Sequence, residues 1–138
     1  MKRILDTNAV SALMKGEPSA VDRLARISPA DVSVPQPVLA EIAYGIERLP
    51  RSRRRKRLQE RFDLVKAGIP RAEWSDAVSE AFGRVKSKLE KRGQRIEDVD
   101  AAIAAHAVAA GATLITANTA HMVRVPDLRV EVWSPEEG

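Results

Sequence analysis

The chain has 138 residues and no cysteine, a length typical of one domain and a composition that excludes disulfide scaffolds and thiolate metal sites. No apolar run reaches the ~18 residues that a membrane span requires, so we expect no membrane association. The net charge is +4, but the segment Arg51–Arg57 alone carries +6, so the remaining residues sum to −2. This distribution predicts a polyanionic partner at the basic segment, although such a run also suits a solvated helix face.

The first residues, MKRIL, start like a signal peptide, with two cations before an apolar stretch. Asp6 then interrupts that stretch, so we expect no signal peptide and a cytoplasmic protein. Neither an internal repeat nor a long linker divides the sequence, which predicts a single domain over residues 1–138.

Short strands and amphipathic helices alternate in the first half of the chain. Strands are expected over residues 2–5 and 32–34, the first ending at a polar triplet and the second at two prolines. The spacing of apolar residues predicts helices over residues 21–27 and 39–49. A further helix is expected to run from the basic segment to Val65.

The second half repeats this alternation. Helices are expected over residues 74–89 and 96–110, the latter alanine-rich, with acids in its first turn and Gly111 after its end. Strands are expected over residues 113–115 and 130–133. Strands separated by helices predict an α/β fold, in which a short central parallel sheet carries helices on both faces.

Three acids fall inside otherwise apolar segments. Asp6 follows the first strand, Glu41 lies beside the apolar stripe of its helix, and Asp100 lies ahead of Ile103. A carboxylate at the edge of a core is costly unless it is paired, hydrogen-bonded or bound to metal. Each also has a structural explanation, since Asp6 and Asp100 suit helix N-termini and Glu41 suits a half-exposed position. Together, with Asp6 and Thr116 both at carboxyl ends of strands, they favour an oxygen-rich site for Mg²⁺ or Mn²⁺.

Four motifs resemble those of PIN domains, and of VapC toxin ribonucleases in particular. They are ILDTN at residues 4–8, VLAEIAYGI at 38–46, DAAIAA at 100–105 and TLITAN at 113–118, and the tail from Arg124 to Glu131 is similar to the ends of VapC toxins. Each motif alone is weak, but the ordered set covers residues 3–133 and is specific. The resemblance implies a three-layer PIN-like fold and a metal-dependent endoribonuclease that is the toxin of a toxin–antitoxin pair.

The resemblance also assigns roles by position. Asp6, Glu41 and Asp100 would be catalytic acids that bind one or two Mg²⁺ or Mn²⁺ ions, and water positioned there would attack an RNA phosphodiester. Thr116 would be a further catalytic residue at the edge of the site.

Other residues would support this site or bind its partners. Thr7, Asn8 and Asn118 would orient the first acid and the strand end by hydrogen bonds, or serve as ordinary turn residues. The family implies a small antitoxin that covers the cleft, and a homodimer. The RNA backbone would be held by the basic segment, through Arg51, Arg53, Arg54, Arg55, Lys56 and Arg57.

One position departs from the family pattern. Where a fourth acid usually follows the last motif by three residues, this chain has His121. As a neutral imidazole ligand, His121 would favour Mn²⁺ over Mg²⁺; alternatively it faces solvent, and one metal ion on Asp6 and Asp100 suffices. Asp98 is a candidate to replace the missing acid, although it also suits a helix start. His106 is expected on an outer helix face without a role, and Trp74 and Phe82 in the core.

Two other classes of function are compatible with parts of the pattern. A PIN fold that has lost catalysis and only binds RNA or a partner protein is indicated by His121, but not by the three retained acids. A phosphoacceptor signalling domain would need an acidic pair after the first strand, whereas Asp6 is followed by Thr7 and Asn8. Metal-dependent cleavage by the purified protein separates a ribonuclease from a binding module.

Overall fold

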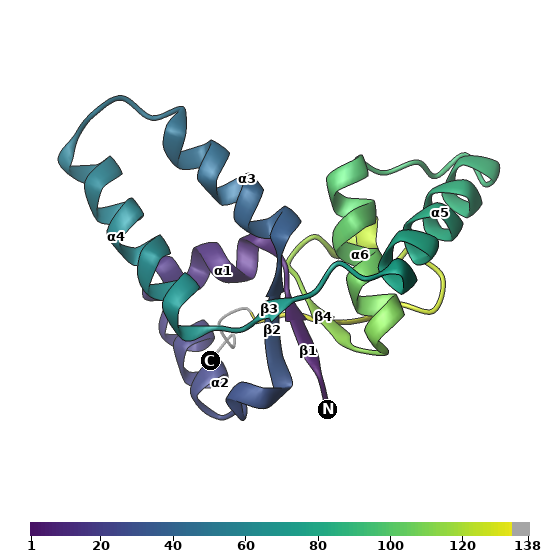
Figure 1. Cartoon of the computed structure of the whole chain (residues 1–138), viewed down its shortest axis with the longest axis horizontal. Helices are drawn as coiled ribbons and strands as arrows, with labels where there is room; N and C mark the ends of the chain where they lie inside the picture. Colours follow the sequence, from purple (N-terminus) through teal and green to yellow (C-terminus); the bar gives the residue numbers. More distant parts are fainter. Residues whose placement is uncertain (134–138) are drawn as a thin grey trace.

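A parallel sheet forms the centre of the fold (Figure 1). The computed structural model describes residues 1–133. Five strands run in the order β3-β2-β1-β4-β5, and each neighbouring pair is parallel. The strands are β1 (Arg3–Leu5), β2 (Val32–Pro35), β3 (Arg71–Ala72), β4 (Thr113–Ile115) and β5 (Arg129–Glu131).

Helices lie on both sides of this sheet, which confirms the predicted α/β class. In Figure 1, α1 to α4 lie on one side, with α3 and α4 projecting as an antiparallel pair, and α5 and α6 pack together on the other side. Within residues 1–133, no helix is long and apolar enough to cross a membrane. The helices are α1 (Thr7–Met14), α2 (Pro18–Ala25), α3 (Gln36–Glu47), α4 (Arg53–Gly68), α5 (Asp76–Lys91), α6 (Asp98–Ala110) and α7 (Thr119–Met122), with a 3₁₀ turn at Pro29–Asp31.

The path of the chain across the sheet reverses at β1. From β1 the chain moves outward to β2 and β3, and then returns to the other side of β1 to form β4 and β5. In open parallel sheets such a reversal leaves a crevice at the carboxyl ends of the two strands beside it. Leu5 of β1 pairs with Ile115 of β4, so the residues that follow, Asp6 and Thr116, meet at this crevice.

Local sequence signals explain where several helices begin and end. Ser52 and Ser75 cap α4 and α5, because their hydroxyl groups accept hydrogen bonds from the backbone N–H groups of Arg55 and Val78. Gly111 ends α6 with a φ of 61°, a left-handed conformation that favours glycine.

The core includes α6 as a central element. Seven consecutive residues of this helix, Ala101 to Ala107, are buried, since α6 packs against α5 as well as against β1 and β4. Its small alanine side chains let the helix lie close to both neighbours. A helix that is buried all round shows no single apolar stripe, so its sequence does not reveal which neighbours it has.

Two side chains differ from the sequence-based expectation because of this packing. His106 is buried (1% exposed), not on an outer face, because α5 covers that side of α6. Trp74 precedes α5 and is 45% exposed instead of buried in the core. Its ring covers His106 edge-on, with ring centroids 5.3 Å apart. Phe82 is half-buried and packs against the core, in line with expectation.

Candidate active site

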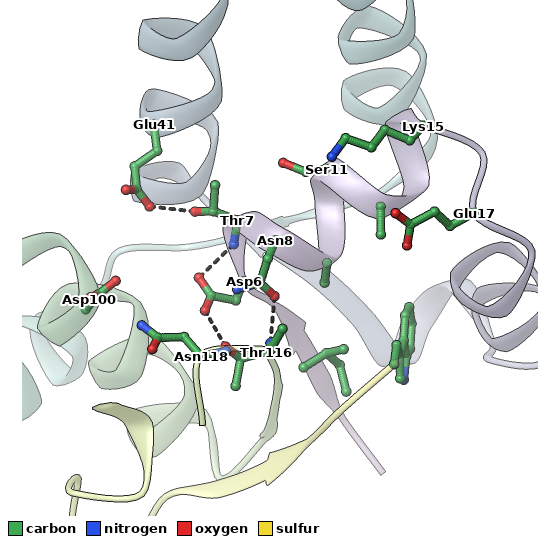
Figure 2. A pocket seen from close by; sticks show the side chains of 15 residues that line it. Asp6, Thr7, Asn8, Ser11, Lys15, Glu17, Glu41, Asp100, Thr116 and Asn118 are labelled. Carbon is green, nitrogen blue, oxygen red and sulfur yellow. Dashed lines mark hydrogen bonds between the residues drawn. The ribbon is translucent and has the colours of Figure 1, made fainter. Parts of the chain in front are cut away.

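A cavity of about 560 Å³ opens at the carboxyl ends of β1 and β4. The predicted acids Asp6, Glu41 and Asp100 all line it, together with Thr116 (Figure 2). These four side chains come from the end of β1, from α3, from the first turn of α6 and from the end of β4. Residues up to 110 positions apart in the sequence are therefore brought to one place by the topology of the sheet.

Asp6 is the most buried of the acids, with 3% of its surface exposed. It is the N-cap residue of α1, and its Oδ1 accepts a hydrogen bond of 2.7 Å from the backbone N–H of Thr7. Its Oδ2 accepts a hydrogen bond of 2.6 Å from the Thr116 hydroxyl. Hydrogen bonds of this kind stabilise the ionised carboxylate and fix its orientation.

Glu41 is tied to the same strand end through Thr7. The Thr7 hydroxyl donates a hydrogen bond of 2.5 Å to Glu41 Oε1, so Thr7 contacts Asp6 with its backbone and Glu41 with its side chain. Figure 2 shows Thr7 between the two carboxylates. This contact holds α3 in register with the end of β1.

Asp100 approaches the cavity from α6, and 19% of its side chain is exposed. Burial raises the pKa of the Asp100 carboxyl, and the negative charges of Asp6 and Glu41 raise it further. His121 acts in the opposite direction and lowers this pKa. The three acids thus repel one another electrostatically without being in contact, which is the arrangement that a cation stabilises.

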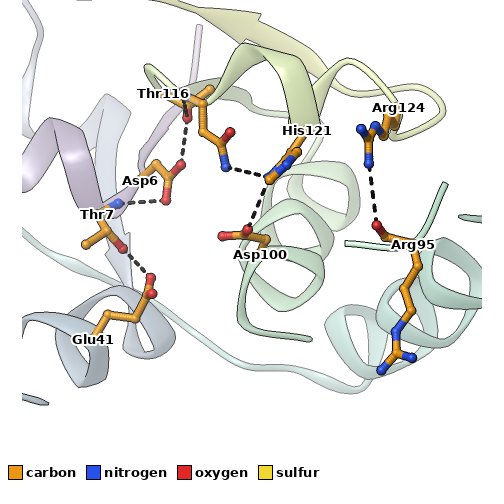
Figure 3. A network of polar contacts seen from close by, with 9 residues as sticks. Asp6, Thr7, Glu41, Arg95, Asp100, Thr116, His121 and Arg124 are labelled. Atoms are coloured by element: carbon orange, nitrogen blue, oxygen red, sulfur yellow. Dashed lines mark hydrogen bonds and ion pairs between the residues drawn. The ribbon is translucent and has the colours of Figure 1, made fainter. Parts of the chain in front are cut away.

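His121 lies beside Asp100 and belongs to α7, the last helix before β5 (Figure 3). Its Nδ1 is 3.9 Å from Asp100 Oδ2 and 3.3 Å from the Asn118 side-chain amide nitrogen. The same nitrogen makes both contacts: it accepts from the amide when unprotonated and pairs with the carboxylate when protonated. His121, at the position where the family usually has an acid, therefore lies beside Asp100 but does not line the cavity itself.

The two asparagines and Asp98 are placed differently. Asn8 Oδ1 accepts a hydrogen bond of 2.7 Å from the backbone N–H of Ala117, which fixes the loop after β4 and not Asp6 directly. The backbone N–H of Asn118 donates to the Thr116 hydroxyl at 2.9 Å. Asp98 points away from the cavity and pairs with Lys86 at 3.1 Å, so the structure does not bring it to the other acids.

The donor set fits a hard divalent cation. The three acids offer carboxylate oxygens, and oxygen ligands are those that Mg²⁺ and Mn²⁺ prefer. Within residues 1–133, no three carboxylate or imidazole side chains converge closely enough to surround one ion. Asp6 and Glu41 are linked through Thr7, and Asp6 also accepts from Thr116, whereas Asp100 approaches from α6.

Comparison with known proteins identifies this arrangement. The PIN domain family model matches residues 3–128. The chain belongs to the PIN domain family. A similar protein is Ribonuclease VapC2 of Rickettsia felis, 30% identical over 132 residues that cover 94% of this chain and 96% of the relative. The tRNA(fMet)-specific endonuclease VapC of Shigella flexneri is 28% identical over 97% of this chain and 99% of its own.

Solved structures agree with the family assignment. The VapBC2 structure from Rickettsia felis, bound to a DNA fragment from its promoter, contains a chain with a TM-score of 0.86 and 28% identity, covering 97% of this PIN domain and 100% of that chain. VapBC-1 from nontypeable Haemophilus influenzae gives a TM-score of 0.83 at 25% identity, covering 98% and 100%. The chain is thus a PIN domain that is similar, over more than nine-tenths of its length, to ribonucleases of the VapC type, as its motifs predict.

The basic segment occupies the loop before α4 and the first turns of that helix. Arg55 is engaged within the protein, since it donates to Glu47 and to the carbonyl oxygen of Leu49, each at 3.1 Å. Arg54 instead lines a cavity of about 310 Å³ that Thr7 and Glu41 also line. The basic segment therefore adjoins the candidate active site through Arg54.

Sequence reasoning missed several residues of the cavity wall, among them the polar residues Ser11, Lys15 and Glu17. Ser11 and Lys15 lie on α1 and line both the acid cavity and the neighbouring cavity beside Arg54 (Figure 2). Their spacing of four residues, continued back to Thr7, places them on one face of a helix. Because no helix was expected directly after Asp6, this signal was not used.

Proposed function

We propose that this PIN domain is a metal-dependent endoribonuclease that acts as the toxin of a toxin–antitoxin pair. The observation that carries the proposal is the convergence of Asp6, Glu41 and Asp100, from three separate elements, on one cavity at the reversal point of a parallel sheet. Crevices of this kind bind ligands in α/β proteins, and carboxylate clusters in them suit divalent cations.

The metal proposed for this cavity is Mg²⁺ or Mn²⁺, held by Asp6, Glu41 and Asp100. When bound, such an ion lowers the pKa of a water molecule and neutralises charge that develops on a phosphate. The protein contributes orientation: Thr116 and the backbone of Thr7 fix both oxygens of Asp6. The Thr7 hydroxyl fixes Glu41, so two of the three acids are positioned before any substrate arrives.

RNA would approach over the basic segment on α4. Arg53, Lys56 and Arg57 make no side-chain hydrogen bond or ion pair within the described residues, which leaves their charges available to phosphates. Affinity for single-stranded RNA should then fall with salt with a log–log slope of about −0.7 per phosphate contacted. Replacing Arg53, Arg54 and Arg57 with glutamine should flatten that slope without moving the cut site.

The decisive experiment compares three substitutions of aspartate. Asp6→Asn and Asp100→Asn should abolish RNA cleavage, because an amide is a poorer ligand for Mg²⁺ and carries no charge. Asp98→Asn is the matched control: it lies on the same helix as Asp100, but its side chain pairs with Lys86 outside the cavity. We expect this variant to cleave RNA like the wild type. If either of the first two variants cuts at the wild-type rate, the proposed site is wrong, and if the wild type binds RNA without cutting it, the protein is a binding module.

An antitoxin partner follows from the relatives. Their structures are VapBC assemblies, and the apolar cavity beside Met14, Ile42 and Leu58 adjoins the acids where a covering segment would block them.

We also propose a homodimer in the cytoplasm. Sedimentation at micromolar concentration would test the dimer, which a 15.1 kDa species would contradict.

A further inference from the structure

A cavity lined by three arginines lies next to the candidate active site, with which it shares Trp133. It has a volume of about 420 Å³, and its wall includes the guanidinium groups of Arg3, Arg23 and Arg26. Glu131 is the one carboxylate among its lining residues, so the wall carries an excess of two positive charges. The chain outside the basic segment is negative overall, so this cluster is a local reversal of charge.

Part of this cluster holds the sheet edge together. Arg3 Nε donates to Glu131 Oε2 at 3.0 Å, and Arg23 Nη1 donates to the carbonyl oxygen of Val132 at 2.7 Å. These contacts tie β5 and the segment after it to β1 and α2. Each guanidinium has five N–H groups, so both arginines retain donors that these contacts do not use.

Arg26 has no such structural role. It is exposed at the end of α2, and its side chain makes no hydrogen bond or ion pair with the part of the chain that the structure describes. A cation near the end of a helix is favourable because of the helix dipole. That effect favours a positive charge at Arg26, and the charge adds to the two guanidinium groups of Arg3 and Arg23 at the same cavity.

The two cavities share a wall. Trp133 lines both the acid cavity and the arginine cavity and is 7% exposed, so its ring separates them. On the opposite side, the acid cavity shares Thr7, Ser11, Lys15 and Glu41 with the cavity beside Arg54. The acid cavity therefore adjoins two cavities that include arginines, one through Trp133 and one through the residues that it shares with the cavity beside Arg54.

We propose that Arg3, Arg23 and Arg26 form a phosphate-binding subsite for the RNA strand, on the opposite side of the cut from the basic segment. A single strand carries one negative charge per nucleotide, and the three acids of the cavity between the arginines repel phosphate when no cation is bound, so binding of the strand depends on the cations beside that cavity. Phosphates on either side of the cut then need positive partners, which Arg54 and Lys15 supply on one side and the arginine cavity on the other. Arginine suits this role because its planar fork binds two phosphate oxygens at once.

This inference rests on the proposed ribonuclease function, but its test does not require cleavage. Binding of a short fluorescein-labelled single-stranded RNA is measured by anisotropy across a range of salt concentrations, in EDTA so that no strand is cut. Arg26→Gln should weaken binding at low salt by about tenfold, the worth of one charge-assisted contact, and should reduce the salt slope by about 0.7. Arg26→Lys should retain the wild-type slope, because the charge remains.

The matched control is Arg84→Gln, which removes an exposed arginine of α5 that lines neither cavity. Shortening the RNA from one end should remove the effect of Arg26→Gln, whereas shortening it from the other end should leave that effect intact. The proposal is overturned if Arg26→Gln binds like the wild type, or if Arg84→Gln weakens binding equally. It is also overturned if Arg26→Gln impairs binding of a poly-glutamate peptide and not of RNA, since the cavity would then recognise acidic protein.

Failure of the inference can be distinguished from failure of the proposed function. If the wild type binds RNA with an Arg26-dependent slope but never cuts it, the ribonuclease function fails and the subsite stands. If the wild type cuts RNA while Arg26→Gln binds normally, only the subsite is wrong.

Discussion

We predict that the buried hydroxyl of Thr116 stabilises the fold as well as orienting Asp6. The side chain is 1% exposed, donates to Asp6 Oδ2 at 2.6 Å and accepts from the backbone N–H of Asn118 at 2.9 Å. Thr116→Val keeps nearly the same shape but removes both hydrogen bonds. The substitution leaves one oxygen of a buried carboxylate, and one backbone donor, without a partner.

The size of the effect follows from these two contacts. A hydrogen bond to a charged group contributes about 1.5–3 kcal/mol, and a bond between neutral groups about 0.5–1.5 kcal/mol. We therefore expect Thr116→Val to lower the free energy of unfolding by about 2–4 kcal/mol. A domain stable by about 5–15 kcal/mol would remain folded, so the variant can be measured.

Urea unfolding in EDTA, followed by circular dichroism, gives these free energies. Thr116→Ser is the control, because it retains the hydroxyl and should lose only about 1 kcal/mol, the worth of a buried methyl group. In a double-mutant cycle, Thr116→Val and Asp6→Asn should be coupled by at least about 1 kcal/mol. The reasoning is refuted if the valine variant is as stable as the wild type, if serine is as destabilising as valine, or if the two substitutions are additive.

Three further predictions concern titratable groups. Asp100→Asn should raise the free energy of unfolding at pH 7 in EDTA, because the pKa of Asp100 is raised in the folded state and its ionisation there costs stability. That gain should shrink as the pH falls and vanish towards about pH 3, below the reference pKa of about 3.9, where folded and unfolded wild type are both protonated; a gain that persists would contradict the cause. Burial lowers the pKa of His106, so the unfolded chain takes up a proton first. Stability should then fall below about pH 6.5, by up to about 1.4 kcal/mol per pH unit. His106→Leu should flatten this acid limb of the stability curve, and an unchanged limb would exclude His106 as its source. If His121 is a ligand, calorimetry should show that His121→Asp raises Mg²⁺ affinity and His121→Ala lowers Mn²⁺ affinity; wild-type affinities in both variants would make His121 a bystander.

Most elements that sequence reasoning located bury a single face or a whole strand, whereas α6 was located from the acids in its first turn and from Gly111 after its end. The strand over residues 113–115 is fully buried and was predicted with its observed limits. The helix with Ile42 and Ile46 on one side was likewise evident from its period, although its end differs by two residues from the predicted one. In these segments the apolar pattern records the burial directly.

The elements that were missed were not marked by such an apolar pattern in the sequence. α1 follows β1 without a break, and its N-cap residue is Asp6, which the sequence allows as a turn residue or as a helix N-cap but for which no helix was predicted directly afterwards. β3 has two residues, too few for an alternation to appear. His106 was misplaced because α6 is buried all round, and a helix without an exposed face does not show which positions face its neighbours.

For the site, the sequence supplied the residue types and the fold supplied their proximity. Asp6, Glu41 and Asp100 could be nominated because each interrupts an apolar segment. Their partners could not be predicted from periodicity, since the contact of Thr7 with Glu41 depends on the angle at which α3 leaves β2. Asp98 could not be distinguished from Asp100 by composition either. Two residues along a helix correspond to a rotation of about 200°, so the two carboxylates lie on different sides of α6.

The position of β1 explains why three consecutive residues organise the whole site. β1 is central, with β2 on one side and β4 on the other, so the end of β1 is adjacent to the ends of both neighbours. Thr7 reaches α3, which follows β2, and fixes Glu41, while Asp6 and Asn8 contact Thr116 and Ala117, which follow β4. At an edge strand the same triplet would reach one neighbour only. A site that must hold acids from both halves of the sheet therefore needs its first acid at the end of the central strand, where the chain reverses its path across the sheet.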